Sequence, residues 1–171
     1  TVAIRERFSL PQDKMIALVM AGAKYSEPYF PFRRIVEPMF GELSNFLDMH
    51  FVFLAGEDYT YAEHLKQVFK ERGITNVSVF NYVEDMVDLM SASDLIVAKS
   101  GGLAVTECIC ARLPLILVGK SYGQERANTY TVTRVGAALE AETAKDLVCQ
   151  LKRVHQTPYI LDQMKEKGEV I

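Results

Sequence analysis

The chain has 171 residues, of which 49% are hydrophobic and 24% charged, and its net charge is −3. This is the length and apolar content of about one globular domain. Because the charge balance is not basic, the composition indicates no nucleic-acid partner. No apolar run approaches the roughly 20 residues of a membrane-spanning helix, and Thr1–Phe8 lacks the apolar core of a signal peptide.

Taken in chain order, residues 1–14 form a lead-in rather than a first element, and strands and helices then alternate. Apolar runs predict strands at Met15–Met20, Phe51–Leu54, Val77–Phe80, Leu95–Ala98, Leu115–Val118 and, more weakly, Ala137–Leu139. Helical patterns lie at Phe32–Leu47, Tyr61–Arg72, Val83–Ser91, Leu103–Ala111, Gln124–Val135, Ala144–His155 and Tyr159–Lys167. The runs are nearly continuous in apolar residues, as in strands covered on both faces. The sequence therefore predicts an α/β fold, with a Rossmann-like parallel sheet of about six strands and helices on both faces.

The cysteines and histidines indicate no metal or redox site. They are Cys108, Cys110, Cys149, His50, His64 and His155. The odd number of cysteines and their spacing complete no metal set, so we expect buried free thiols. Each histidine is expected to be structural or exposed to solvent.

Ligands of an open α/β sheet bind at the carboxyl ends of the strands, where the strand order reverses. The first such segment is Ala21–Pro31, a long connection that carries two prolines, several aromatics and Gly22. It matches neither the dinucleotide fingerprint nor the P-loop. Gly22 is thus either a turn glycine or a ligand contact.

The second segment runs from Lys99 to Glu107. Gly101 and Gly102 let the backbone approach a ligand, and free amides at the following helix N-terminus favour a phosphate. Glu107 lies one turn into that helix. Its spacing alone allows two interpretations, a carboxylate that complements the helix dipole or one that accepts the two hydroxyls of a ribose.

The third segment, Gly119–Asn128, places Gln124, Glu125 and Asn128 at a helix start. Side chains of these types are ordinary helix-start groups. They are also the amide and carboxylate groups that a sugar needs, since hydroxyls both donate and accept hydrogen bonds.

Together these segments resemble a known family. The string that carries the resemblance is Lys99-Ser100-Gly101-Gly102-Leu103, then Thr106-Glu107, Leu113-Pro114 and Gly123-Gln124-Glu125-Arg126-Ala127-Asn128. It is similar to the C-terminal domain of family 28 glycosyltransferases of the GT-B fold. The closer likeness is to diacylglycerol glycosyltransferases similar to monogalactosyldiacylglycerol synthase, and the peptidoglycan lipid II synthase is more distant. The order of elements agrees over the whole chain, most strongly from Phe80 to Gly136.

The resemblance implies a UDP-sugar donor bound by residues 15–171, with residues 1–14 as a lead-in from a separate N-terminal acceptor domain. The implied diphosphate contacts are Ser100, Gly101, Gly102 and Leu103, with Gly22 facing them across the cleft. It further implies that Thr106 and Glu107 belong to the site, with Glu107 on the ribose, and that Tyr82 and Val83 give backbone contacts to uracil. Gln124, Glu125 and Asn128 would serve the donor sugar. Two positions depart from the family pattern, the glycine-poor Ala21–Lys24 stretch and Ala104, where threonine is common.

The implied reaction is an inverting transfer of a hexose to a lipid acceptor. The resemblance implies no cofactor and no metal, and a general base in the N-terminal domain, so the isolated chain would be inactive. We expect a cytoplasmic protein, peripheral at the membrane when full length. The abrupt start at Thr1 favours a piece of a longer protein over a natural separate subunit.

Two other functions remain open. A UDP-sugar hydrolase or epimerase would share the glycine turn and the Glu107 helix, although the Gly123–Asn128 string favours a transferase. A non-catalytic donor-binding subunit that docks on a membrane partner is suggested by the aromatic residues between Tyr25 and Phe32, which would otherwise pack in the core.

Overall fold

The structure is a computed structural model that describes residues 1–20 and 29–171, without the side chains of residues 29–31, 102 and 103. Six strands form one sheet in the order β3-β2-β1-β4-β5-β6, and every neighbouring pair is parallel. They are β1 (Met15–Met20), β2 (Met49–Leu54), β3 (Val77–Phe80), β4 (Leu95–Ala98), β5 (Leu115–Val118) and β6 (Ala138–Ala141). The predicted Rossmann-like sheet is confirmed, and β1, β3, β4 and β5 have the predicted bounds.

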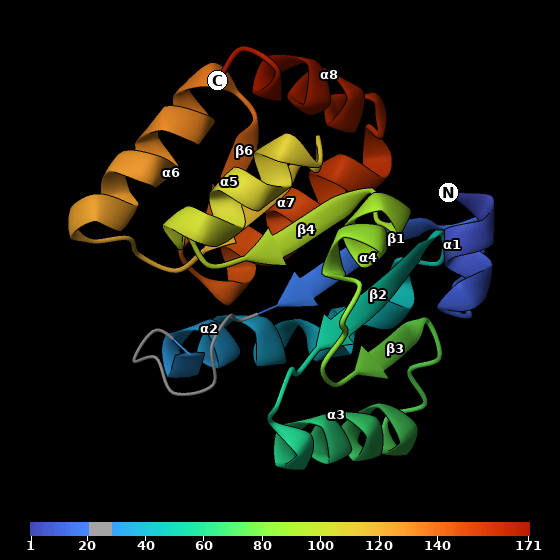
Figure 1. The fold of residues 1–171 in the computed structure, drawn as a ribbon. Coiled ribbons are helices and arrows are strands. Elements are labelled where there is room, and N and C mark those ends of the chain that lie inside the picture. The colour runs from blue at the N-terminus through green and yellow to red at the C-terminus, as the bar shows by residue number, and fades with distance from the viewer. Residues whose placement is uncertain (21–28) are drawn as a thin grey trace.

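Helices connect the strands and cover both faces of the sheet (Figure 1). Their bounds are α1 (Val2–Arg7), α2 (Tyr29–Val36), the 3-10 helix η1 (Glu37–Asn45), α3 (Tyr59–Glu71), α4 (Met86–Ala92), α5 (Gly102–Cys110), α6 (Gly123–Val135), α7 (Ala144–Gln156) and α8 (Tyr159–Gly168). The described helices are too short and too polar for any of them to cross a bilayer.

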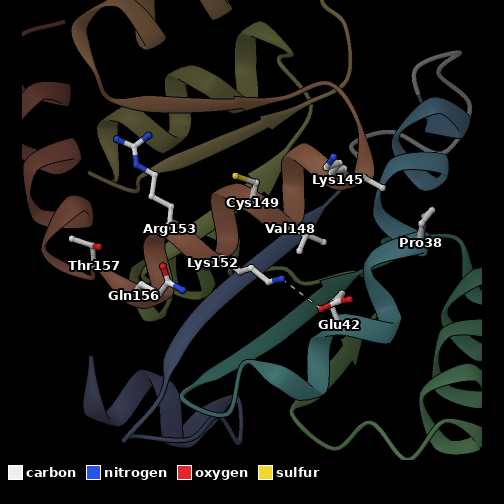
Figure 2. Close-up of a pocket in the computed structure, with 10 residues that line it drawn as sticks. Pro38, Glu42, Lys145, Val148, Cys149, Lys152, Arg153, Gln156 and Thr157 are labelled. Atoms are coloured by element: carbon white, nitrogen blue, oxygen red, sulfur yellow. Dashed lines mark ion pairs between the residues drawn. The ribbon is translucent and has the colours of Figure 1, made fainter.

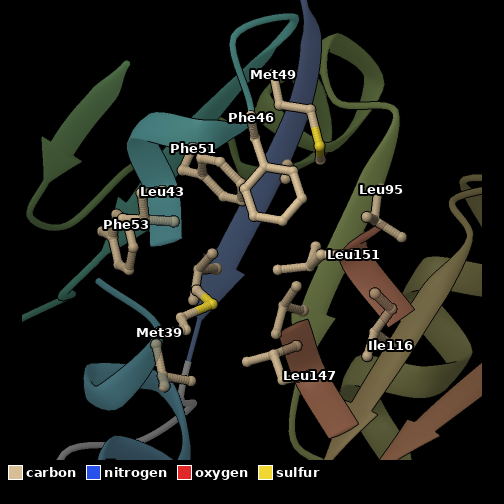
Figure 3. Packing of buried hydrophobic residues seen from close by; sticks show 14 of the residues in the cluster. Met39, Leu43, Phe46, Met49, Phe51, Phe53, Leu95, Ile116, Leu147 and Leu151 are labelled. Carbon is tan, nitrogen blue, oxygen red and sulfur yellow. The ribbon is translucent and has the colours of Figure 1, made fainter. Parts of the chain in front are cut away.

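The alternation of side chains along the strands divides the core into two clusters, one for each face. On one face Ala17 and Val19 of β1 pack with residues of α2, η1, α3, α7 and α8. Figure 3 shows this cluster, in which Phe46 and Phe51 meet edge to face beside Leu151. On the other face Ile16 and Leu18 pack with α4, α5 and α6.

The lead-in predicted without a first element contains one, which corrects that prediction for residues 2–7. Helix α1 is held by Arg5, whose side chain is 9% exposed. The Arg5 guanidinium donates to the carbonyl of Ala92 at 3.0 Å and to Asp94 Oδ2 at 2.8 Å. The same Asp94 oxygen accepts from the backbone N–H of Ile16, so one carboxylate joins α1, β1 and the start of β4.

The single helix predicted for Phe32–Leu47 is also wrong in part. It changes from α-helix to 3-10 helix at Glu37, where Pro38 lies in the first turn of η1. Proline removes a backbone donor and clashes with a preceding carbonyl, so a continuous α-helix through this point is unfavourable. By contrast, Gly136 ends α6 in the left-handed region at φ 86°, as the sequence predicted.

Candidate functional site

The strand order reverses between β1 and β4, which are adjacent although two strands separate them in sequence. All six strands are parallel, so their carboxyl ends lie at one edge of the sheet. In doubly wound sheets the ligand crevice opens at this edge beside the reversal point. The segments that follow β1 and β4 therefore flank the expected crevice. The segment after β1 includes Gly22, which lies outside the described residues.

The β4–α5 connection presents backbone donors to this edge. Ser100 is buried and Gly101 is the N-cap of α5, with extended backbone at φ −64° and ψ 136°. In the described part of the chain no side chain caps this helix, and a Cβ built on Gly101 would meet nothing within 4 Å. The first amides of a helix have no partner within it, so the N-terminus of α5 is open to an anion.

Glu107 is exposed on the side of α5 that faces α4. It lines a pocket of about 460 Å³ whose other walls are Met86, Val87, Met90, Ser91, Cys110, Ala111 and Arg112. The carboxylate is therefore accessible to a ligand, and it lies beyond the first turn of α5, further into the helix than predicted, because the helix begins at Gly102. Thr106 precedes it and is also exposed.

The predicted uracil contacts, Tyr82 and Val83, come a few residues before Met86, which lines this pocket. Tyr82 and Val83 belong to the connection between β3 and α4, because α4 begins at Met86 and not at Val83 as predicted. Tyr82 is 65% exposed, whereas Val83 packs partly against the core. Since Met86 shares a pocket with Glu107, the start of α4 lies beside α5.

The start of α6 brings polar side chains to the carboxyl end of β5. Gly119 and Gly123 both have positive φ, +89° and +55°, so the connection turns sharply before α6. Gln124 is exposed, and Glu125 and Asn128 are half-buried. Glu125 lies in the first turn of α6.

A lysine–glutamate ion pair joins the β4–α5 and β5–α6 connections. Lys99 Nζ lies 2.6 Å from Glu125 Oε1, with the side chains 21% and 33% exposed. Both residues line a pocket of about 510 Å³ with Phe32, Arg34, Ile35, Val118, Gly119, Lys120, Tyr122 and Glu142. The structure thus brings Lys99, the residue before Ser100, into contact with Glu125.

Lys99 was absent from the predicted site residues. The sequence does indicate that Lys99 and Glu125 could meet. Lys99 directly follows β4 and Glu125 comes after β5, and the carboxyl ends of parallel strands lie at the same edge of a sheet.

A larger pocket lies away from this edge, in the groove between η1 and α7. It measures about 740 Å³, and Figure 2 shows Val148, Lys152 and Glu42 among its walls. None of the predicted site residues that the structure describes lines this pocket. We therefore place the candidate site at the carboxyl edge, where the helix N-terminus and the polar side chains meet.

A second charged cluster, which no sequence pattern indicated, fixes the last turn of α2. Arg33 donates to Asp58 Oδ2 at 2.7 Å and stacks on the ring of Tyr61, with its Cζ 3.3 Å from the ring centroid. Tyr61 donates its hydroxyl to Glu37 at 3.2 Å. Burial raises the pKa of Tyr61 and lowers that of Arg33. The cluster anchors α2, the helix that begins directly after residues 21–28, against α3.

The histidines occupy structural or solvent-exposed places, as predicted. His50 Nε2 lies 2.8 Å from Ser78 Oγ, and burial, aided by Lys14, lowers its pKa. His155 packs edge to face on Phe46, and His64 is exposed on α3.

The prediction of buried thiols holds only for Cys108; Cys110 and Cys149 are exposed. Cys110 follows Cys108 by two residues, so the two side chains leave α5 in different directions. Cys149 lies on the groove side of α7. Within residues 1–20 and 29–171 no three metal-ligating side chains gather.

The topology defines a Rossmann-like type of domain, with the candidate site at the carboxyl edge of its sheet. Residues 18–169 match the Glycosyltransferase family 28 C-terminal domain, so the chain belongs to that family.

Among curated proteins, the processive diacylglycerol beta-glucosyltransferase of Bacillus mycoides (strain KBAB4) is 24% identical over 163 residues. The match covers 95% of this chain and 40% of that protein, so the chain spans less than half of the length of this relative.

Solved structures share the fold. The C-terminal CMP-Kdo binding domain of WaaA from Acinetobacter baumannii has a TM-score of 0.73 at 9% identity and covers 98% of this chain and 93% of its own. Acinetobacter baumannii MurG has a TM-score of 0.73 at 20% identity, over 98% of this chain and 47% of its own. The UDP-GlcNAc 2-epimerase from Neisseria meningitidis, bound to UDP-GlcNAc, has a TM-score of 0.72 at 13% identity. The match covers 96% of this chain and 42% of the epimerase chain. The predicted resemblance to GT-B C-terminal domains is confirmed at the level of family and fold.

Proposed function

We propose that this chain is the UDP-sugar-binding domain of an inverting glycosyltransferase that transfers a hexose to a diacylglycerol-like or related lipid acceptor. The family membership supports a glycosyltransferase. The processive diacylglycerol beta-glucosyltransferases among the relatives support a lipid acceptor and a hexose. The observation that carries the proposal is the open N-terminus of α5 at the reversal point, next to the Lys99–Glu125 pair.

In this proposal each segment of the edge binds one part of the donor. The amides around Ser100, Gly101, Gly102 and Leu103 bind the diphosphate, with Gly22 across the cleft. Thr106 and Glu107 belong to the ribose site, where Glu107 accepts both hydroxyls. The backbone of Tyr82 and Val83 contacts uracil, and Gln124, Glu125 and Asn128 hold the sugar.

The reaction we propose is a direct displacement at the anomeric carbon. The acceptor oxygen attacks, the bond to the diphosphate oxygen breaks, and the departing charge is stabilised by the preorganised donors of α5. No metal is needed for this step. The general base comes from an N-terminal acceptor domain, to which residues 1–14 lead from the donor domain of residues 15–171, so the isolated chain binds donor without turnover. The full-length protein acts in the cytoplasm at the membrane surface.

Calorimetric titration tests the proposal most cheaply. The chain is titrated with UDP, UDP-glucose and UDP-galactose, with CDP, which carries the same diphosphate, as a control for base selectivity. We expect one site for the uridine nucleotides and weaker binding of CDP. Absence of binding by all of them at protein concentrations near millimolar would refute the proposal.

A UDP-sugar hydrolase or epimerase is the second candidate, and its specific support is the fold shared with a UDP-GlcNAc 2-epimerase. Full-length protein incubated with donor distinguishes the two reactions. Release of free sugar and UDP at the same rate with and without a lipid acceptor favours the hydrolase, and an epimerised nucleotide sugar favours the epimerase. Dependence of UDP release on the acceptor favours the transferase.

The third candidate is a non-catalytic donor-binding subunit that docks on a membrane partner. The side chains that suggested it are Tyr25, Tyr29, Phe30 and Phe32. The first three lie outside those that the structure describes, and Phe32 is buried in the core, as the alternative of core packing predicted. If Tyr25→Ser and Phe30→Ser leave partner association and vesicle binding unchanged, this candidate is lost.

A further inference from the structure

The ion pair between Lys99 and Glu125 spans the two connections that the proposed donor site uses. Its ammonium and carboxylate are 2.6 Å apart, and both side chains are more than half buried. A cation and an anion in this setting interact more strongly than an exposed pair, because less water screens them. The pair therefore fixes the start of α6 relative to the turn that precedes α5.

The pair also sets the charge next to the proposed diphosphate position. Lys99 is one residue before Ser100 and two before the N-cap of α5. An unpaired Glu125 carboxylate at this point would repel an anionic ligand, since like charges in a partly desolvated site disfavour each other. With Lys99 bound to it the pair is neutral, and the α5 amides act on the anion without that opposition.

Among the described residues, the contact leaves one oxygen of Glu125 available. Lys99 binds Oε1, and the second oxygen keeps its lone pairs for a sugar hydroxyl in the shared pocket of about 510 Å³. A carboxylate held at one oxygen loses little further freedom when it binds a ligand, which lowers the cost of orienting it.

We propose that Lys99 is a positioning residue for the donor: its ammonium holds Glu125 in the orientation that binds the sugar and neutralises that carboxylate, so that the diphosphate can bind beside it. This inference rests on the proposed function, because it assumes that a nucleotide diphosphate binds at the N-terminus of α5. Lys99 itself acts through Glu125 and not as a phosphate ligand.

Substitutions of the pair test this by calorimetry with UDP on the intact chain. Lys99→Met leaves the Glu125 charge uncompensated and is expected to weaken UDP binding about tenfold, whereas Lys99→Arg keeps it within a few-fold. Adding Glu125→Gln to Lys99→Met removes the repelling charge and is expected to restore UDP affinity to near that of the parent. Glu125→Gln alone should bind UDP as tightly as the parent or more tightly. In any variant that lacks Lys99 or Glu125, UDP-glucose should bind no more tightly than UDP.

The matched control is Lys66→Met, which removes the same charge from an exposed lysine–glutamate pair on α3. It is expected to bind UDP like the parent. Unchanged UDP binding by Lys99→Met would overturn the inference, and so would a double variant as weak as Lys99→Met, because the lysine would then act on the phosphates directly. Should Lys99→Met fail to fold, weaker UDP binding by Glu125→Gln alone would overturn it equally. A parent chain that binds neither UDP nor UDP-glucose refutes the proposed function, and the inference falls with it.

Discussion

At the scale of single residues, Glu107 is the side chain whose role separates a structural from a ligand-binding interpretation. Its carboxylate is exposed on α5 and lines the pocket shared with α4. Hydrogen bonds to a charged group are worth about 1.5–3 kcal/mol each, less where water replaces them. We therefore predict that Glu107→Gln weakens UDP binding roughly ten- to a hundred-fold. The melting temperature should change little, because Glu107 is exposed and lies beyond the first turn of α5, where the helix dipole has little effect.

Titration calorimetry and thermal unfolding of the same variant distinguish the two interpretations. Glu166→Gln, on the exposed side of α8, serves as the control for an amide replacing a surface carboxylate. A lower melting temperature with unchanged UDP binding would assign Glu107 a structural role alone.

Thiol reactivity is a second property that belongs to single residues. Cys108 is fully buried, and burial, with a contribution from Glu107, raises the pKa of its thiol to about 12. The thiolate is the reactive form, so Cys108 should resist a thiol reagent at neutral pH while Cys110 and Cys149 react. We predict two reactive thiols in the native chain and three in denaturant, counted by absorbance and located by peptide mass. Rapid labelling of Cys108 in the folded chain would contradict the packing of α5.

At the scale of elements, α1 is the helix whose attachment is most open to test. Arg5→Met removes a buried cation that holds Ala92 and Asp94, and it leaves the Asp94 carboxylate with fewer donors. Breaking such a pair costs roughly 2–4 kcal/mol. Arg7 on the same helix pairs with Asp85 and Asp88 in exposed positions, and Arg7→Met should cost only about 0–1 kcal/mol. Denaturant unfolding of both variants measures the difference. Equal losses would mean that α1 contributes no buried contact.

The same helix shows where sequence patterns stop being informative. Helix α1 has six residues, too short for a clear apolar period, and its largest buried side chain is an arginine. Its stability comes from contacts with residues about 87 positions away, which local propensity does not encode. The change at Pro38 was readable in principle, since a proline inside a helical pattern marks a break.

At the scale of the whole molecule, the sheet was predictable because parallel strands covered on both faces are nearly continuous in apolar residues. Leu95–Ala98 and Leu115–Val118 show this directly, and every side chain in both is buried. The order of the strands in the sheet was not predictable in this way, because nothing in the apolar runs specifies that β1 pairs with β4. The structure supplies that placement and, with it, the edge at which the candidate segments lie.

The candidate site was predictable as segments more than as contacts. The glycines at the start of α5 and the polar start of α6 marked two candidate connections in the sequence, and the structure places both after parallel strands at the carboxyl edge of the sheet. The Lys99–Glu125 distance depends on how β4 and β5 align, which requires the fold. Gly22 stays a prediction, because it lies outside the described residues.

The central claim is that a nucleotide diphosphate binds at the carboxyl edge beside the β1–β4 reversal, and amide chemical shifts of the isotope-labelled chain during a UDP titration test it most directly. The account predicts saturable shifts that concentrate in residues 99–107, around Tyr82 and Val83, and at the start of α6. Amides lining the η1–α7 groove, such as Val148 and Lys152, should stay unchanged. Shifts confined to that groove, or no shifts at millimolar UDP, would contradict the account.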